Sequence, residues 1–279
     1  MKRNLRFVIS DCKLTPYLVC LLLIGALCLH TTEFASPEPL DPDLVLYFDY
    51  EEFKGDTVIE KSGRGYDGEI NGKVTQSDDG KFGKAGLFAA GSFLDLDGAN
   101  VDPDDIPTEG MSVIAWINVE AISDMAIFNA RAADGTWLVH PEARGDGNYR
   151  WLNRGPNPGR TIFDIRAGKN EANKWQHYAG TYSRADELAV LYINGNKVGE
   201  EKSRLDTPIA DNWGQGARVG FNIDNKRPFT GLMDELNVWK RGLTEEEVNA
   251  IMNDSVEAFL AVEAHGKLAT TWGKLKASK

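Results

Sequence analysis

The chain has 279 residues, of which 42% are hydrophobic and 26% are charged, a composition typical of a folded globular protein that excludes a largely disordered one. Its formal net charge at pH 7 is −11, which argues against nucleic acid and against an anionic membrane surface as partners. An acidic chain of this kind suits a soluble role outside the cytoplasm, and it suits the binding of a hard cation.

Residues 1–35 have the layout of a secretory signal. Basic residues near the start are followed by an apolar run at residues 17–29. This run is shorter than the roughly 18 to 20 residues that span a bilayer. We therefore predict a signal peptide, with a retained N-terminal anchor as the alternative, and a secreted, periplasmic or cell-surface location in which only this segment meets the membrane. The three cysteines all lie in this segment, so the exported part has no disulfide.

The next predicted segments are a linker and one domain. Residues 36–43 contain three prolines, which is typical of an extended linker. In residues 44–253 the apolar runs are short, rich in β-branched and aromatic residues, and separated by Gly, Asn, Asp and Pro. This spacing predicts many antiparallel strands with no helices between them. Within the domain, Asn194 and Gly195 supply the positive φ angles that a tight hairpin needs.

One short helix is predicted at the end of the domain. Thr244 and Glu247 have the spacing of a capping box, and Leu243 and Val248 have the spacing of a hydrophobic staple. Residues 254–279 contain several lysines and form a basic tail after the acidic domain. This tail is a candidate contact with another protein.

Several segments resemble one known family. The segment "NKWQHYAGTYSRADELAVLYINGNKVG" at residues 173–199 resembles the central strands of laminin-G-like jelly-roll domains, which belong to the concanavalin A-like lectin and glucanase superfamily. "LVLYFDYEEFKGDTVIEKSGRGYDGEING", "MSVIAWINV" and "ARVGFNIDNKRPFTGLMDELNVWKRGLTEEEV" agree with the same pattern in order. The resemblance implies an all-β fold, a two-sheet antiparallel jelly-roll sandwich with one short C-terminal helix.

The sequence does not favour catalysis. Retaining glucanases of this superfamily place Glu-x-Asp-x-x-Glu on one strand, so that two carboxyl groups face each other about 5 to 5.5 Å apart. The chain contains no Glu-x-Asp, no Gly-x-Ser-x-Gly and no His-Glu-x-x-His. We therefore predict that the protein is not an enzyme, with a glycosidase or lyase of unfamiliar site as the least favoured alternative.

Calcium is the cofactor that the resemblance implies. In similar domains a structural Ca²⁺ joins the first strand to the closing strand, and Asp49, Glu51 and Asp234, with a carbonyl near Gly91, are the corresponding candidates here. Ca²⁺ prefers six to eight oxygen ligands, so carboxylates that meet at the edge of a sheet suit it. The alternative is that Asp49 and Asp234 accept backbone N–H groups in turns.

The middle of the chain, residues 137–166, is the predicted ligand surface, because its aromatic and planar polar side chains are the groups that commonly hold sugars. The candidates are Trp137, His140, Tyr149, Arg150, Trp151, Asn153, Arg154 and, from a later loop, Trp213. Strand alternation places Tyr149, Trp151 and Asn153 on one face and Arg150, Leu152 and Arg154 on the other. Only one of these faces can belong to the core.

These observations predict an exported non-catalytic binding module that recognises a carbohydrate or a glycoprotein surface. A protein-binding or adhesion module of a cell-surface assembly, docked through the basic tail, is the alternative.

Overall fold

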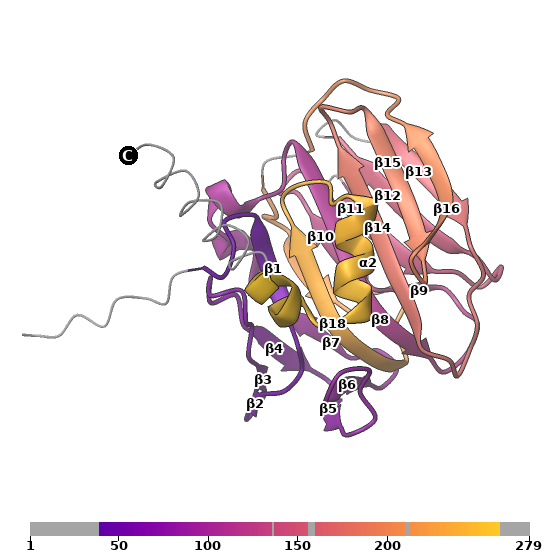
Figure 1. Cartoon of the computed structure of the whole chain (residues 1–279). Helices are drawn as coiled ribbons and strands as arrows, with labels where there is room; N and C mark the ends of the chain where they lie inside the picture. Colours follow the sequence, from indigo (N-terminus) through magenta and orange to yellow (C-terminus); the bar gives the residue numbers. More distant parts are fainter. Residues whose placement is uncertain (1–38, 136, 156–159, 210–211, 263–279) are drawn as a thin grey trace, which may run out of the picture. The chain divides into compact units, whose positions relative to one another are not determined.

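The computed structural model describes residues 39–135, 137–155, 160–209 and 212–262. These residues form two antiparallel sheets, which confirms the predicted jelly-roll sandwich (Figure 1). The predicted leader, residues 1–35, and residues 263–279 of the predicted tail lie outside the described residues. Within the described ranges, no helix has the length and hydropathy that crossing a membrane requires.

The first sheet has eight strands among the described residues. Their order is β16 (Asn196–Lys202), β15 (Leu188–Ile193), β14 (Gln176–Ser183), β8 (Gly110–Val119), β18 (Gly231–Trp239), β6 (Ala85–Phe88) and β5 (Val74–Ser77), and β1 (Leu44–Phe48) also pairs with β18. Strand β8 is central and nearly all of its residues are buried, because the core covers one face and a helix covers part of the other.

The second sheet has ten strands among the described residues. Their order is β13 (Thr161–Ala167), β12 (Tyr149–Arg154), β11 (Trp137–Ala143), β10 (Phe128–Arg131), β17 (Gly216–Val219), β7 (Phe93–Asp95), β4 (Gly68–Asn71), β3 (Thr57–Val58) and β2 (Phe53–Lys54), and β9 (Met125–Ala126) pairs with β11. Two short 3-10 helices, η1 (Gly98–Asn100) and η2 (Pro103–Asp105), follow β7.

The main core lies between the two sheets and contains most of the buried aromatic side chains. A second apolar cluster lies on the outer face of the first sheet, where Ile114 and Tyr192 of the sheet are buried together with Val248 and Ile251 of helix α2 (Glu245–Asn253). Figure 1 shows α2 lying across this sheet. One outer face of the sandwich is therefore occupied by a helix of the chain itself.

Helix α2 begins as the sequence predicts. Thr244 accepts a hydrogen bond from the backbone of Glu247, and the side chain of Glu247 accepts one from the backbone of Thr244. Residues 256–262 are also helical, and Val256 and Phe259 are buried in the second cluster. The backbone N–H of Val256 donates to Glu235 Oε2 over 2.8 Å. Thus the first part of the predicted tail packs against the sandwich.

Candidate binding site

The candidate site lies on the second sheet, on the opposite side of the sandwich from α2. Strand alternation decides which side chains reach it. In β11, Val139 and Ala143 point into the core, so His140 and Glu142 point outward. In β12, Tyr149 and Trp151 point into the core, so Arg150 and Arg154 point outward.

The register of the two strands brings the outward side chains together. Glu142 is the direct partner of Arg150 in the antiparallel ladder, and His140 is the partner of Leu152. Directly opposed residues in such a ladder have Cβ atoms about 4.5 to 5.5 Å apart. A carboxylate and a guanidinium therefore meet on the outer face even though they lie on different strands.

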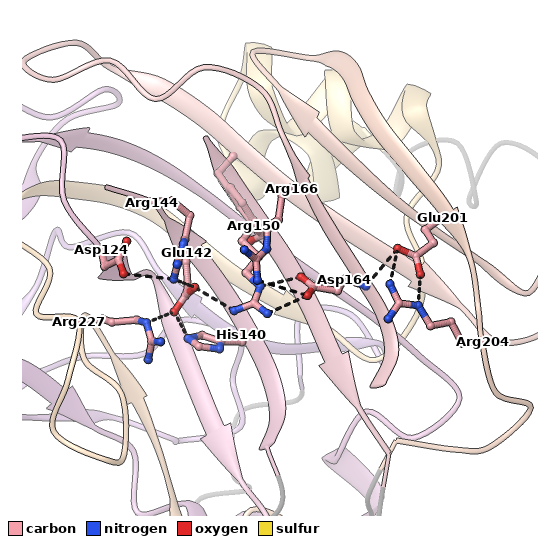
Figure 2. Close-up of polar contacts among 11 residues, drawn as sticks. Asp124, His140, Glu142, Arg144, Arg150, Asp164, Arg166, Glu201, Arg204 and Arg227 are labelled. Atoms are coloured by element: carbon pink, nitrogen blue, oxygen red, sulfur yellow. Dashed lines mark hydrogen bonds and ion pairs between the residues drawn. The ribbon is translucent and has the colours of Figure 1, made fainter. Parts of the chain in front are cut away.

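Glu142 is the centre of a buried ion-pair network (Figure 2). Its Oε2 accepts a hydrogen bond from Arg144 Nη1 over 2.8 Å, and Arg227 Nε lies 2.8 Å from its Oε1. His140 Nε2 also contacts Oε1, and Arg150 Nη1 lies 3.6 Å from Oε2. Because the side chain of Glu142 is 0% exposed, these partners compensate a charge that water cannot reach.

The same contacts set the protonation states. Burial alone would raise the pKa of Glu142, but the contact with His140 and the nearby guanidinium groups outweigh burial and hold this pKa below its usual value. Burial lowers the pKa of His140 below its usual value, with Glu142 opposing the shift and Arg227 and Arg150 adding to it. Near neutral pH the site therefore holds a charged carboxylate beside a neutral imidazole.

The network continues across the second sheet to β13 and from there to β16, an edge strand of the first sheet. Arg150 donates to both oxygens of Asp164, from Nε over 2.7 Å and from Nη2 over 2.9 Å. Such a bidentate pair fixes the plane of the guanidinium group. The backbone N–H of Asp164 donates to Glu201 Oε2 over 3.3 Å, and Glu201 also accepts from Arg204 (Figure 2). Arg150 is therefore held between Asp164 on one side and Glu142 on the other.

The loop between β17 and β18 closes one side of the site, and buried hydrogen bonds anchor it. Asn129 is fully buried, accepts from the backbone of Ile223 over 3.0 Å and donates to the backbone of Val139 over 2.8 Å. Ala126 N donates to the carbonyl of Arg227 over 2.9 Å. The side chain of Asn129 in β10, itself held by β11, and a backbone N–H of β9 thus position a loop that is distant from them in sequence.

A polar pocket lies between this loop and the two strands. It has a volume of about 230 Å³ and is lined by His140, Arg150, Arg154, Asp224, Lys226 and Arg227. The volume equals about eight water molecules at roughly 30 Å³ each. The pocket is smaller than the roughly 300 to 1,000 Å³ of sites that enclose drug-sized ligands, so it admits a small polar group such as one sugar unit.

The structure separates the predicted ligand residues into two sets. His140, Arg150 and Arg154 line the pocket together. Tyr149, Trp151, Asn153 and Trp213 lie on the core side and are 0 to 2% exposed. The side chain of Trp137, at the start of β11, lies outside the described residues.

The prediction of an aromatic platform is therefore corrected for the buried rings. Trp151 donates from Nε1 to the carbonyl of Thr181 over 3.0 Å, and its ring lies so close to Gly180 that an added Cβ would be 2.6 Å from Cδ2. Trp213 packs against Phe128 with ring centroids 5.6 Å apart. A ring that is enclosed in this way stabilises the core and cannot stack on a sugar in solution.

Sequence reasoning missed four residues of the site: Glu142, Asp224, Lys226 and Arg227. Glu142 lies two positions after His140, so alternation in the strand could have indicated that the two share a face. The other three are in a loop whose position depends on Asn129, which is far away in sequence. No local pattern marks that relation.

The proposed calcium ligands are only partly brought together. Asp234 Oδ2 accepts from the backbone of Lys81 and Phe82 over 2.8 and 2.9 Å, and its Oδ1 accepts from Glu235 N over 2.8 Å. Glu51 Oε1 accepts from Lys84 N and Asp49 Oδ1 from Glu51 N. In the described part of the chain, no group of three or more His, Cys, Asp and Glu side chains is arranged to hold a metal ion.

Gly91 lies away from these carboxylates. In the pairing of β18 with β6, Met233 is opposite Gly86 and Gly231 is opposite Phe88, so Asp234 lies near the start of β6. Gly91 comes after the end of β6, on the far side from Asp234. The carboxylates of Asp49, Glu51 and Asp234 accept backbone N–H groups, which is the alternative that the sequence left open, and calcium at this position stays a prediction.

A family model described as the concanavalin A-like lectin/glucanases superfamily matches residues 95–249. The chain belongs to this superfamily. The matched residues include the neighbouring strands β8 and β18 of the first sheet and the strands β11 and β12, which carry the pocket. No curated protein matches the chain.

Solved structures of the superfamily fold are similar to this chain at low identity. The binding domain of Paraclostridial Mosquitocidal Protein 1 has a TM-score of 0.57 and 18% identity, covering 77% of this chain and 52% of its own. Domain 4 of AbnA, an extracellular GH43 arabinanase from Geobacillus stearothermophilus solved with arabinotriose, has a TM-score of 0.52 and 19% identity, covering 75% and 98%. The binding domain of botulinum neurotoxin DC, in complex with SialylT, has a TM-score of 0.57 and 14% identity, covering 77% and 52%. This chain spans about half of the mosquitocidal-protein and neurotoxin binding domains, and at these identities the likeness shows the fold alone.

Proposed function

We propose that this protein is an exported non-catalytic binding module that recognises a glycan or a glycoconjugate through the pocket on the second sheet. The observation that carries the proposal is the pocket itself, in which Asp164 fixes Arg150 and the buried Glu142 fixes Arg227 before any ligand arrives. Fixed planar donors lose little conformational entropy when they bind hydroxyl or carboxyl groups.

The similar structures support a role in binding. One is the arabinanase domain solved with arabinotriose, one is described as the binding domain of a mosquitocidal protein, and one as the binding domain of a botulinum neurotoxin. These ligands belong to those proteins. They support a binding role for the fold, and the chemistry of the pocket in this chain has to supply the specificity.

The pocket does not favour glycoside hydrolysis. That reaction uses two carboxyl groups, one of which acts as an acid with a raised pKa. Among the described residues that line the pocket, Asp224 is the one carboxylate. Glu142 lies beneath the pocket, but its lowered pKa keeps its carboxylate charged, and its ion pairs leave it unable to donate a proton to a substrate. An enzyme is therefore the least supported alternative.

A glycan-array screen of the intact protein tests the proposal. We expect binding to a subset of glycans, and we expect the double substitution of Arg154 and Lys226 by glutamine to abolish it. Substitution of Arg184 by glutamine is the matched control, because this partly exposed arginine does not line the pocket. Absence of binding to any glycan, with retention on a cell-surface protein that is lost when residues 263–279 are removed, would establish the alternative of a protein-binding module.

We also propose that any calcium bound by this protein is held at Asp49, Glu51 and Asp234, without Gly91. Burial raises the pKa of Asp49 and raises that of Asp234 to about 7, so a cation at this position would have to displace protons. The melting temperature should then increase with calcium more strongly at alkaline pH than at acidic pH. The increase should disappear in Asp49→Asn, and an equal response in the wild type and this variant would contradict the assignment.

A further inference from the structure

Three side chains of the pocket are not used by the ion-pair network. The Nε atom of Arg154 and the Oδ1 atom of Asp224 are buried without a hydrogen-bond partner among the described residues. Within the same residues, Arg154, Asp224 and Lys226 form no ion pair. Leaving a buried polar atom without a partner costs about 1 to 3 kcal/mol. A ligand that hydrogen-bonds to these atoms would remove this cost, which favours binding.

From this arrangement we infer that the pocket selects a sugar that carries a negatively charged group, either a carboxylate or a sulfate. The inference rests on the proposed function and specifies its ligand class. Arg154 and Lys226 supply two positive charges that no protein carboxylate neutralises, and Asp224 supplies one negative charge. These three groups alone therefore leave an excess of positive charge for the ligand.

The charge of the network beneath does not cancel this excess. Its ion pairs join five arginines to four carboxylates: Arg144, Arg150, Arg166, Arg204 and Arg227 to Asp124, Glu142, Asp164 and Glu201. Figure 2 shows these groups in a row that runs from Arg227 and Asp124 at one end to Glu201 and Arg204 at the other. The pocket is thus locally positive in a chain whose net charge is −11. A local positive field in an acidic protein attracts anions and steers them to this face.

The geometry gives each free group a role. Arg154 ends β12, and its planar guanidinium can bind a carboxylate or a sulfate through two parallel hydrogen bonds. Lys226 adds a mobile point charge from the loop. Asp224 accepts hydrogen bonds, so it matches the hydroxyl groups of the same sugar. Anion and hydroxyl recognition together distinguish an acidic sugar from a free inorganic anion.

Titration calorimetry with defined oligosaccharides tests the inference. The anionic probes are sialyllactose, trigalacturonic acid and sulfated lactose, and the neutral probes are lactose, arabinotriose and the methyl ester of sialyllactose. We expect at least one anionic probe to bind at least about tenfold more tightly than its neutral counterpart, since hydrogen bonds to charged groups have this magnitude. We expect its affinity to fall with ionic strength. The carboxylate and sulfate probes separate the two sources of charge.

Substitutions then locate the effect. Arg154→Gln should remove the preference for the anionic probe and leave the melting temperature unchanged, and Arg184→Gln should change neither. Neutral sugars that bind as tightly as anionic ones, or a preference that survives Arg154→Gln, would overturn the inference while leaving the proposed function intact. Failure of every glycan of the array and of every probe to bind would refute both.

Discussion

Glu142→Gln tests whether the buried network holds the site together. The substitution keeps the shape of the side chain but removes the charge that faces Arg144, Arg227 and His140. Removing one partner of a buried ion pair costs about 3 to 5 kcal/mol. We expect the lower end, because Arg144 keeps a contact of 3.4 Å with Asp124 and Arg227 is partly exposed.

A loss of about 3 kcal/mol corresponds to a decrease in melting temperature of about 6 to 12 °C for a domain of this size. Thermal denaturation measures this decrease. Glu201→Gln is the control: because its partner Arg204 is half-exposed, we expect this substitution to lower the free energy of unfolding by only about 0 to 1 kcal/mol. A decrease no larger in Glu142→Gln than in the control would refute the role of the network.

The pH dependence gives a second readout of the same variant. The folded-state pKa of Glu142 is lowered relative to the unfolded chain, so its charged form stabilises the fold above the unfolded pKa of about 4.3 and this stabilisation is lost as pH falls. The difference in the free energy of unfolding between wild type and Glu142→Gln should therefore narrow at acidic pH. A difference that stays constant would show that shape, not charge, is responsible.

Three further predictions concern the scaffold. Burial raises the pKa of Asp234 to about 7 and that of Glu235 to about 8, so the folded state keeps protons that the unfolded chain releases above about pH 4.5. The free energy of unfolding should consequently fall by up to about 1.4 kcal/mol per pH unit for each group between about pH 4.5 and 7, and Glu235→Gln should remove its share of this slope in urea titrations. Trp151→Ala should cost about 3 to 5 kcal/mol in urea unfolding because the ring is fully buried, and a cost below about 1 kcal/mol would place the ring outside the core. Thr244→Ala should cost about 1 kcal/mol through loss of the capping box, and an unchanged melting temperature would show that the cap is dispensable.

The fold was predictable because its signals are local. Short strands bounded by turn residues predict the antiparallel layers, and the hairpin at Asn194 and Gly195 forms with φ angles of 52° and 74°, between the paired residues Ile193 and Asn196. The capping box of α2 is equally local. Each of these features depends on residues within four positions of one another.

The site was only half predictable because its signals are not local. Alternation in β12 correctly separates Trp151 from Arg150, but it does not say which face is buried, since both faces carry polar and apolar groups. The decision is made by neighbours on other strands, namely Glu142 and Asp164, which neutralise Arg150 on the outer face. Their pairing with β12 follows from sheet register, which no short motif encodes.

The acidic residues of β18 show the same limit. The register of β18 against β8 shifts between Asp234 and Asn237, and Glu235 has a φ angle of 50°. This irregularity buries both Asp234 and Glu235, where regular alternation would turn one of them to each face. Their raised pKa values arise from that burial. A sequence pattern that assumes a regular strand does not contain this information.

Binding and stability should be separable in this site, because different side chains carry them. Glu142 is buried and surrounded by partners, whereas Arg154 has no ion pair among the described residues and faces the pocket. Arg154→Gln should therefore weaken glycan binding and leave the melting temperature within about 1 to 2 °C of the wild type, as expected for a surface substitution. If Arg154→Gln instead lowers the melting temperature as much as Glu142→Gln, Arg154 belongs to the supporting network, and the charge available to a ligand is smaller than the pocket suggests.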